Sequence, residues 1–340
     1  MKKVLIDQPG KIEIVESEMP TPKEGEALLK IKYCGICGAD VASYTGNQPF
    51  TTYPRIPGHE FSAEIVSIAK NNPFGLKQGD IVTANPYFNC GSCYSCQRGY
   101  VNCCTDNQTM GVQRDGSFCE YITMPVERII SGNGLSAKEL ALIEPFAIGY
   151  HALSRANIEP TDRILVIGAG PIGLFALISA KLRGAMVYVA DVLEGRLETA
   201  KEYGADGVIH VSGQNLMKEV KCITGGKGFD ICVEACGLSS TFLDCIDAAA
   251  FAGKVILIGN GKKETSFLHS VLLKKELNVY GSRNAYTKDF KALIQLVAAG
   301  KVDVLKMVSE VYPMERAMEA FEALVHNDGS LKKVLIEISS

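Results

Sequence analysis

The pattern of hydrophobic and polar positions in this chain changes close to residue 145. Before it, short segments that alternate apolar and polar residues are separated by turn residues such as Pro9-Gly10, Pro20-Thr21-Pro22 and Gly79-Asp80. Alternation with period two between such turns predicts β-strands, here at residues 4–6, 12–15, 27–31, 61–68 and 81–84. The first part of the chain is therefore predicted to be a mostly β domain with long loops.

After residue 163, nearly continuous apolar runs alternate with helical segments. Strands are predicted at residues 163–167, 186–190, 207–210, 229–234, 254–258 and 277–280, and helices at 172–183, 194–203, 215–224 and 239–251. Apolar strands separated by helices predict a parallel sheet covered on both faces, and this order of elements is typical of a doubly wound dinucleotide-binding fold.

The pattern is mixed again after Ser282, with helices predicted at residues 289–299 and 314–324 and a last strand at 333–338. These residues have no obvious core of their own, so we expect them to return to the first domain. The prediction is an α/β protein in which residues 1–150 and 285–340 form one domain and residues 151–284 form a Rossmann-type domain.

Composition narrows the classes of function. The 340 residues are 47% hydrophobic and 21% charged, with a net charge of −3, which excludes disorder and gives no electrostatic footprint for nucleic acid. The uncharged stretch at residues 164–180 is too short to span a membrane, and glycines interrupt it. Twelve cysteines without a secretory leader predict a reducing, cytoplasmic location in which clustered thiols bind metal.

A cysteine cluster is the most specific metal signal in the chain. Cys90, Cys93 and Cys96 follow one another at three-residue spacing, with Gly and Ser residues that permit tight turns, and Cys103 and Cys104 come next. Four thiolates around one ion make a closed, structural zinc site. An iron–sulfur cluster is the main alternative, and spacing leaves the fourth ligand open between Cys103 and Cys104.

A glycine-rich turn predicts a nucleotide site. The segment Gly168-Ala169-Gly170-Pro171-Ile172-Gly173 follows a predicted strand and opens a predicted helix. Gly168 allows the tight turn, Gly170 lets the backbone approach a pyrophosphate, and Gly173 brings the helix close to the sheet. The unpaired amides of the helix N-terminus then face the phosphates.

The residue that ends the next strand indicates which dinucleotide binds. Asp191 lies eighteen residues after Gly173, where a carboxylate hydrogen-bonds the ribose hydroxyls of NAD and repels the 2′-phosphate of NADP. Arg196 could stack on adenine or pair with a phosphate, so NADP stays an alternative. We predict NAD as the cofactor.

Three separated segments carry the donors that a catalytic zinc uses. Cys37 lies in a turn flanked by glycines, His59-Glu60 follows about twenty residues later, and Glu144 precedes Pro145. A thiolate, an imidazole and a carboxylate, with one position left for water or substrate, form a catalytic zinc site.

Together these motifs resemble the zinc-dependent medium-chain dehydrogenases, the superfamily of alcohol, sorbitol and threonine dehydrogenases. The resemblance covers essentially the whole chain and implies a GroES-like catalytic domain beside the Rossmann domain, with two zinc ions per chain and a dimer or tetramer. The matching segments are Gly35-Ile36-Cys37-Gly38, Gly58-His59-Glu60, Gly79-Asp80, the cysteine cluster, Asp115-Gly116-Ser117-Phe118, Glu120-Tyr121, Glu144-Pro145 and the glycine-rich turn.

The resemblance also implies roles for single residues. Cys37 and His59 match the zinc ligands, Asp40 would orient His59, and Glu60 and Glu144 match carboxylates that bind zinc directly or through water. Alcohol dehydrogenases of the family carry cysteine at the position of Glu144, so this residue indicates the polyol and sugar branch. Alignment with the family also selects Cys104 over Cys103.

The implied reaction is hydride transfer from a carbinol carbon to NAD, with zinc as Lewis acid. The segments Asn47-Gln48-Pro49-Phe50 and Tyr53-Pro54-Arg55, and Gly281 to Asn284, look like those of L-gulonate and L-galactonate 5-dehydrogenases. Arg283 is a candidate for a bidentate contact to a substrate carboxylate, and a surface arginine or a contact to a cofactor phosphate is the alternative. Ser43 and Asn284 are further candidate substrate residues. Sorbitol or a polyol phosphate is the near alternative, and L-threonine or butanediol a more distant one. The alternative from a different class of function is a zinc-free, non-enzymatic protein of the same fold.

The chain departs from the family at two positions of the usual proton relay. Ala39 and Ala42 stand where the family has a hydroxyl residue and often a histidine. The alcohol proton must therefore leave by another route, and we rank zinc-bound water with Glu60 or Glu144 ahead of Ser43.

Overall fold

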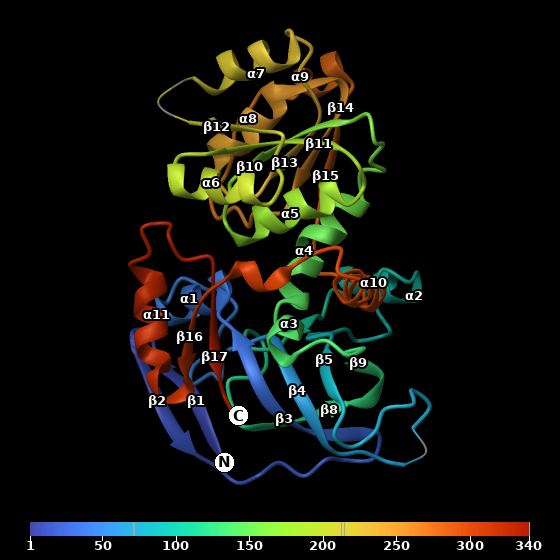
Figure 1. Cartoon of the computed structure of the whole chain (residues 1–340), viewed down its shortest axis with the longest axis vertical. Helices are drawn as coiled ribbons and strands as arrows, with labels where there is room; N and C mark the ends of the chain where they lie inside the picture. Colours follow the sequence, from blue (N-terminus) through green and yellow to red (C-terminus); the bar gives the residue numbers. More distant parts are fainter. Residues whose placement is uncertain (71, 212, 214, 340) are drawn as a thin grey trace. The chain divides into compact units, whose positions relative to one another are not determined.

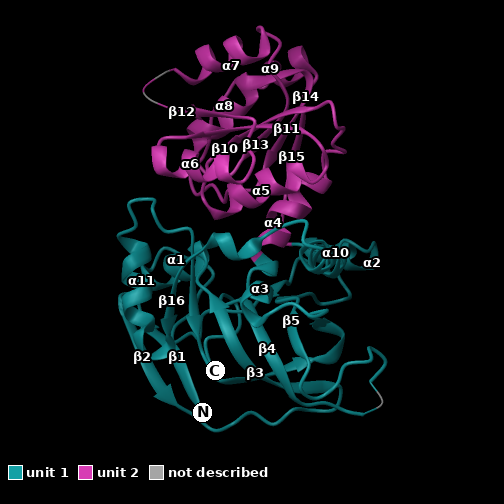
Figure 2. Cartoon of the chain, viewed as in Figure 1, with its two compact units in different colours: residues 1–144, 285–340 teal, residues 145–284 magenta. Residues whose placement is uncertain are grey.

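The chain forms two compact units (Figures 1 and 2). The computed structural model describes residues 1–70, 72–211, 213 and 215–339. The first unit contains Met1–Glu144 and Ala285–Ser340, and the second contains Pro145–Asn284. The division falls near the start of helix α4 (Ile143–Ser154).

The first unit is built on a seven-stranded sheet with the order β16-β17-β3-β4-β5-β9, in which β8 also pairs with β3. Strands β3, β4 and β17 carry or border the predicted metal-ligating residues. β3 is antiparallel to both β4 and β17, so the ends of these three strands meet. The bounds are β3 (Glu26–Gly35), β4 (Glu60–Ser67), β5 (Ile81–Ala84), β8 (Tyr121–Pro125), β9 (Ile129–Ser131), β16 (Val308–Pro313) and β17 (Lys333–Glu337).

Two short sheets complete the strands of this unit. They pair β1 (Lys2–Gln8) with β2 (Lys11–Glu16) and β6 (Tyr87–Phe88) with β7 (Gln108–Thr109). The helices are α1 (Gly38–Tyr44), α2 (Tyr94–Gln97), α3 (Ala137–Leu140), α10 (Thr287–Ala298) and α11 (Ala317–Val325), and single 3₁₀ turns lie at Val101–Cys103, Val126–Arg128, Val304–Met307 and Met314–Arg316.

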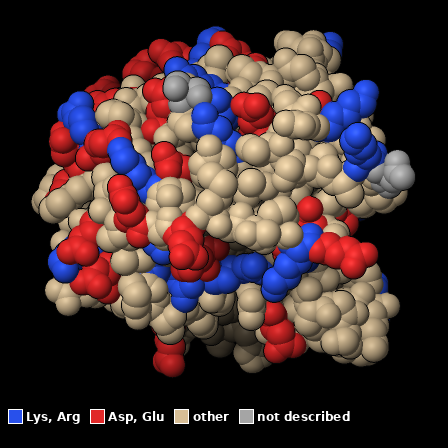
Figure 3. Space-filling view, turned by 90° about the horizontal axis from the view of Figure 1, so that it is seen from below, with Lys and Arg blue, Asp and Glu red and all other residues tan. Residues whose placement is uncertain are grey.

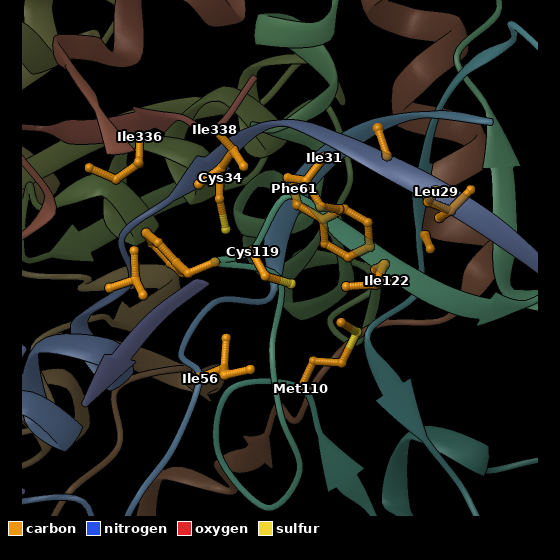
Figure 4. Packing of buried hydrophobic residues seen from close by; sticks show 14 of the residues in the cluster. Leu29, Ile31, Cys34, Ile56, Phe61, Met110, Cys119, Ile122, Ile336 and Ile338 are labelled. Atoms are coloured by element: carbon orange, nitrogen blue, oxygen red, sulfur yellow. The ribbon is translucent and has the colours of Figure 1, made fainter. Parts of the chain in front are cut away.

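The core of the first unit joins segments that are far apart in the sequence (Figure 4). Ile31 of β3, Phe61 of β4 and Ile336 of β17 are fully buried together. Burial of such side chains contributes about 1.5–3 kcal/mol each, and this burial holds the three strand ends in place.

The second unit contains a six-stranded, fully parallel sheet with the order β12-β11-β10-β13-β14-β15. This order is that of the doubly wound dinucleotide fold, so the predicted fold class is confirmed. The strands are β10 (Arg163–Ile167), β11 (Met186–Asp191), β12 (Gly207–His210), β13 (Phe229–Glu234), β14 (Ala249–Leu257) and β15 (Asn278–Gly281), and the helices are α5 (Pro171–Lys181), α6 (Glu194–Glu202), α7 (Leu216–Thr224), α8 (Ser239–Ala248) and α9 (Ser270–Lys275).

One predicted boundary in this unit is wrong. The pattern extended a helix to residue 251, whereas α8 ends at Ala248 and β14 begins at Ala249. Ala249 pairs with Phe229 of β13, and Phe251 is 65% exposed. The pairing with β13 outweighs the helical propensity of the alanines, which is a weak local preference.

Basic and acidic side chains are interspersed on the face shown in Figure 3. Among the described residues, none of the helices has the length and apolar character needed to cross a bilayer.

Candidate active site and metal centres

The turn at Cys37 is held by the carboxylate of Asp40. Cys37 precedes helix α1, and Asp40 lies in the first turn of that helix with no exposed surface. Its Oδ2 accepts from the backbone N–H of Cys37, and its Oδ1 accepts from that of Gly58, both at 2.9 Å. Asp40 therefore ties the turn of Cys37 to the loop that carries His59.

Glu60 begins strand β4 opposite Gly35, the last residue of β3. A Cβ atom at Gly35 would lie 2.3 Å from Oε2 of Glu60. A side chain at this position would force the carboxylate of Glu60 to move, so the glycine leaves space for that carboxylate. The glycine of the Gly35-Ile36-Cys37 segment makes room for a second site residue.

These segments bring three donors together. The Sγ of Cys37, a ring nitrogen of His59 and a carboxylate oxygen of Glu60 lie within 4.8 Å of one another. His59 and Glu60 are 5% and 1% exposed. A buried thiol, imidazole and carboxylate at this separation are the donor set of a catalytic zinc site, so the residues fit that metal.

The orientation of His59 also suits a metal ligand. Its Nδ1 is buried, lies 3.9 Å from Oδ1 of Asp40, and has no hydrogen-bond partner among the described residues. Ligating histidines usually have a carboxylate beside the second ring nitrogen, which fixes the ring. Asp40 occupies that place.

Lys333 is a residue of this cluster that the sequence did not reveal. It begins β17, is 3% exposed, forms an ion pair with Oε2 of Glu60, and donates to the carbonyl of Ile36 at 3.2 Å. The sequence shows only a lysine before an apolar strand. Its meeting with Glu60 depends on the pairing of β17 with β3.

The charges of the cluster favour a bound cation. Burial raises the pKa of the Cys37 thiol, and the negative charge of Glu60 raises it further. Burial would lower the pKa of His59, but the charges of Asp40 and Cys37 outweigh this effect and place it well above its ordinary value. Several buried acids thus face few positive groups, an imbalance that a divalent ion would offset.

Glu144 lies close to this cluster without belonging to the three-donor set. It is the second residue of α4, is 2% exposed, and accepts a hydrogen bond at Oε1 from the hydroxyl of Tyr87. Burial raises the pKa of its carboxyl to about 7, and the charge of Glu60 acts in the same direction. Tyr87 was also missed in the sequence, where it is one aromatic residue ahead of the cysteine cluster.

Ser43, the other candidate for the proton route, has a fully buried side chain. Its hydroxyl lies 2.8 Å from that of Thr51 and donates to the carbonyl of Ala39 at 3.1 Å. Ala39 lies in helix α1 and Thr51 follows that helix, so both hydrogen-bond partners of the Ser43 hydroxyl are local.

The second candidate metal centre is the set Cys90, Cys93, Cys96 and Cys104, whose Sγ atoms lie within 4.8 Å of one another. The Sγ of Cys104 is 3.5 Å from that of Cys90 and 3.9 Å from that of Cys93. Four sulfurs bound tetrahedrally at about 2.3 Å from one zinc ion are about 3.8 Å apart. A cluster of several iron atoms would need wider spacing, so the geometry fits a single zinc.

Local hydrogen bonds prepare two of these thiols as ligands. Backbone N–H groups of Cys96 and Thr105 lower the pKa of Cys93 to about 6, and those of Cys93 and Ser92 lower the pKa of Cys90. Thiolates bind zinc, so these bonds favour the binding form. Cys104, and not Cys103, completes the set.

In the second unit, the glycine-rich turn joins β10 to α5. Gly168 has a φ of +103°, a conformation that favours glycine. A Cβ at Gly173 would lie 1.8 Å from the carbonyl oxygen of Gly168, whereas a Cβ at Gly170 would meet nothing within 4 Å. Gly168 thus permits the backbone conformation of the turn, and Gly173 permits close packing against it. Among the described residues, no protein atom lies close to the position that a side chain of residue 170 would occupy. Pro171 is the first residue of the helix, and Ile172 follows it.

Asp191 ends strand β11 beside this turn. It is 7% exposed, and its Oδ2 and Oδ1 accept from the N–H groups of Ala169 and Leu193 at 2.7 Å and 2.9 Å. Arg196 lies 3.8 Å from Oδ2. The structure therefore brings the predicted cofactor residues to one edge of the parallel sheet. Arg283 and Asn284, the predicted substrate contacts, lie at the end of the second unit.

The raised pKa of Glu144 predicts how pH affects a protein without zinc at the three-donor cluster. Between pH 4.5 and about 7 the folded carboxyl keeps a proton that the unfolded chain has released, so stability falls as pH rises. In a Cys37→Ala background we expect a loss of about 2–3 kcal/mol over this range. Thermal unfolding at several pH values measures it. The Cys37→Ala/Glu144→Gln variant, which cannot ionise there, should show a smaller slope, and equal slopes would contradict the prediction.

Comparison with known proteins agrees with these features. Residues 23–133 match the model of the alcohol dehydrogenase GroES-like domain, and residues 171–299 match that of the zinc-binding dehydrogenases. The chain is 38% identical to L-galactonate-5-dehydrogenase of Escherichia coli K12 over 99% of its own length and 98% of the relative's. It is 31% identical to a sorbitol dehydrogenase of Bacillus subtilis, with 99% and 97% covered.

A solved structure extends the likeness to the fold. The chain superimposes with a TM-score of 0.92 on an alcohol dehydrogenase from Escherichia coli CFT073 that was solved with NADH, at 30% identity and with 99% of each chain covered. The two matching family models and the relatives aligned over nearly the whole length agree on the family of the chain. The chain belongs to the zinc-dependent medium-chain dehydrogenases and is an alcohol or polyol dehydrogenase of that family.

Proposed function

We propose that this protein transfers a hydride between NAD and the carbon of a secondary hydroxyl group in a sugar acid or polyol. The meeting of Cys37, His59 and Glu60 within 4.8 Å is the observation that carries the proposal. The glycine-rich turn with Asp191 supports the dinucleotide part. Zinc and NAD are the cofactors.

In this proposal Cys37, His59 and Glu60 hold the catalytic zinc, and a fourth position stays open for substrate or water. Zinc, when bound, polarises the oxygen of the alcohol or carbonyl group and so favours hydride transfer. Lys333 offsets the charge of Glu60, and Asp40 holds the ring of His59. Cys90, Cys93, Cys96 and Cys104 hold the structural zinc.

Glu144 is proposed as the group that receives the alcohol proton. Its carboxyl has a pKa of about 7, which suits exchange of a proton near neutral pH. The alanines at positions 39 and 42 supply no hydroxyl or imidazole, and the hydroxyl of Ser43 is engaged by Thr51 and Ala39. Glu144 would therefore act through a water molecule, and Cys37, His59 and Glu60 would be the direct ligands.

Asp191 is proposed to bind the ribose hydroxyls of NAD. Its position beside the glycine-rich turn supports this role, and its charge opposes a 2′-phosphate. Arg196 forms an ion pair with Asp191, so the guanidinium of Arg196 is less available to bind a 2′-phosphate. The open side of Gly170 suits the pyrophosphate at the N-terminus of α5.

The choice of substrate is the finer part of the proposal. The relative at 38% identity is named for L-galactonate, and the sorbitol dehydrogenase covers as much of the chain at 31%. We place hexonates such as L-galactonate and L-gulonate first and sorbitol-type polyols second, because the sequence offers Arg283 for a carboxylate. Polyol phosphates, L-threonine and butanediol follow. The cytoplasmic location and the homo-oligomer stay predictions.

Initial rates of NAD and NADP reduction with these five classes of compound test the proposal. We expect NAD with a hexonate to give the highest kcat/KM. Arg283→Ala should raise KM for hexonates by about 10-fold or more, the effect of one charge-assisted hydrogen bond, while KM for sorbitol stays within 2-fold.

Arg283→Lys is the matched control, because it keeps the charge and loses the two-pronged geometry, and it should have an intermediate KM for hexonates. An equal rise of KM for hexonates and sorbitol would remove Arg283 from carboxylate binding. A preference for sorbitol in the unaltered enzyme would establish the second candidate instead.

A further inference from the structure

Tyr87 and Glu144 form a buried pair beside the three-donor cluster. The hydroxyl of Tyr87 donates to Oε1 of Glu144, and the two residues are 6% and 2% exposed. Their side chains come from β6 and α4, which are more than fifty residues apart in the sequence. A buried carboxylate can turn toward a metal or away from it, and a fixed donor on one oxygen limits that motion.

The backbone of Tyr87 is held on both sides. Its N–H donates to Oδ1 of Asn85 at 3.0 Å, and its carbonyl accepts from the guanidinium of Arg128 at 2.6 Å. The same guanidinium donates to Oδ1 of Asn89 at 3.0 Å. The position of the phenol hydroxyl is therefore set by a network that does not depend on Glu144.

The residue after Tyr87 strengthens this anchor. The guanidinium groups of Arg114 and Arg128 lie over the ring of Phe88, at 3.6 Å and 4.3 Å from the ring centroid. Each such contact contributes about 0.5–2 kcal/mol. Asn89 then donates to Sγ of Cys96 at 3.9 Å, so β6 continues directly into the four-cysteine centre.

Glu144 is buried beside the cluster, outside the set of three donors that lie within 4.8 Å of one another. Its charge interacts with His59, Glu60 and Lys333 as well as with Tyr87. The three donors leave one position of a tetrahedral zinc open, which is the condition for catalysis. A fourth protein ligand in that position would give a closed site that holds zinc more firmly and excludes substrate.

We propose that Tyr87 is a positioning residue that keeps Glu144 off the metal and so keeps the fourth position open. The proposal rests on the proposed function, in which Cys37, His59 and Glu60 are the ligands and Glu144 acts through water. It predicts opposite effects on metal retention and on turnover when the hydroxyl is removed. Damage to the fold would weaken both.

The test is Tyr87→Phe, which keeps the ring and removes only the donor. We expect kcat to fall by about 10-fold or more and the catalytic zinc to leave for a chelator about 10-fold more slowly, since one charge-assisted bond no longer restrains Glu144. Zinc release is followed with a chromophoric chelator. In a cobalt-substituted protein, the visible bands should change in intensity as a fourth protein ligand binds.

Tyr44→Phe is the matched control. Tyr44 is also a buried tyrosine of the first unit, and its hydroxyl donates to the carboxylate of Glu322. The control loses the same kind of bond and should keep the zinc release rate, the cobalt spectrum and kcat within 2-fold of the unaltered enzyme.

A double variant identifies the group through which Tyr87 acts. In a Glu144→Gln background, Tyr87→Phe should leave the zinc release rate unchanged, because the neutral amide is a poor zinc ligand. Faster zinc release in Tyr87→Phe, or an unchanged rate, would overturn the proposal. An unaltered enzyme that holds a single zinc per chain would instead contradict the proposed function, so the two failures can be told apart.

Discussion

Replacement of Cys37 by serine is expected to leave one zinc ion per chain and to lower NAD reduction by about 10³-fold or more. Cys37 supplies the only thiolate among the three donors within 4.8 Å, and a buried hydroxyl is a much weaker zinc ligand. Elemental analysis gives the zinc content, and NADH absorbance gives the rate. The four-cysteine centre should keep its ion, so the protein stays folded.

Cys34→Ser is the control for this experiment. Cys34 is fully buried three residues earlier, and its thiol contacts the hydroxyl of Ser117 at 3.0 Å instead of the three-donor cluster. We expect the control to hold two zinc ions and to stay active. If Cys37→Ser also held two ions and turned over substrate, the cluster would not be the catalytic centre.

Replacement of Cys104 by serine is expected to remove the other zinc ion and to destabilise the first unit. Cys104 has no exposed surface, and its sulfur lies 3.5 Å and 3.9 Å from two other thiols. Structural zinc binding contributes about 10–16 kcal/mol in small domains, and we expect a loss on the order of 5 kcal/mol here because the unit has its own core. Tm should fall by roughly 10 °C.

The adjacent Cys103 provides the control. It lies in a 3₁₀ turn and is not part of the four-sulfur set, so Cys103→Ser should keep both ions and its Tm within 2 °C or so. Loss of zinc in Cys103→Ser but not in Cys104→Ser would reverse the assignment. We also expect Cys104→Ser to lower activity, because β6 (Tyr87–Phe88) ends only two residues before Cys90.

The sequence predicted the second unit well because the signals of that unit are local. Strands β10 and β11 coincide with apolar runs, the glycine-rich turn directly follows β10, and Asp191 is the last residue of β11. Parallel strands have their carboxyl ends at one edge of the sheet, so placing Asp191 beside the turn needs only the correct order of elements. The end of α8 was wrong because Ala249 pairs with a strand residue twenty positions earlier.

The contacts of the three-donor cluster could not be predicted in the same way. Lys333 meets Glu60 only because β17 pairs with β3, and β3 pairs with β4. Tyr87 meets Glu144 only through the folding of the first unit, which contains both residues. No spacing rule relates residues separated by 57 or by 273 positions, the latter being 333 minus 60.

The sequence by itself determined the parts whose residues are neighbours along the chain. The cysteine centre fits within fifteen residues, and the nucleotide turn within six, so short-range geometry restricts what each can bind. The resemblance to the family had already selected Cys104 over Cys103. The tertiary structure alone decided that Lys333 pairs with Glu60 and that the hydroxyl of Tyr87 meets Glu144. The pairing of Lys333 with Glu60 depends on the burial of β3, β4 and β17 in one core, a collective effect of packing that no single segment encodes.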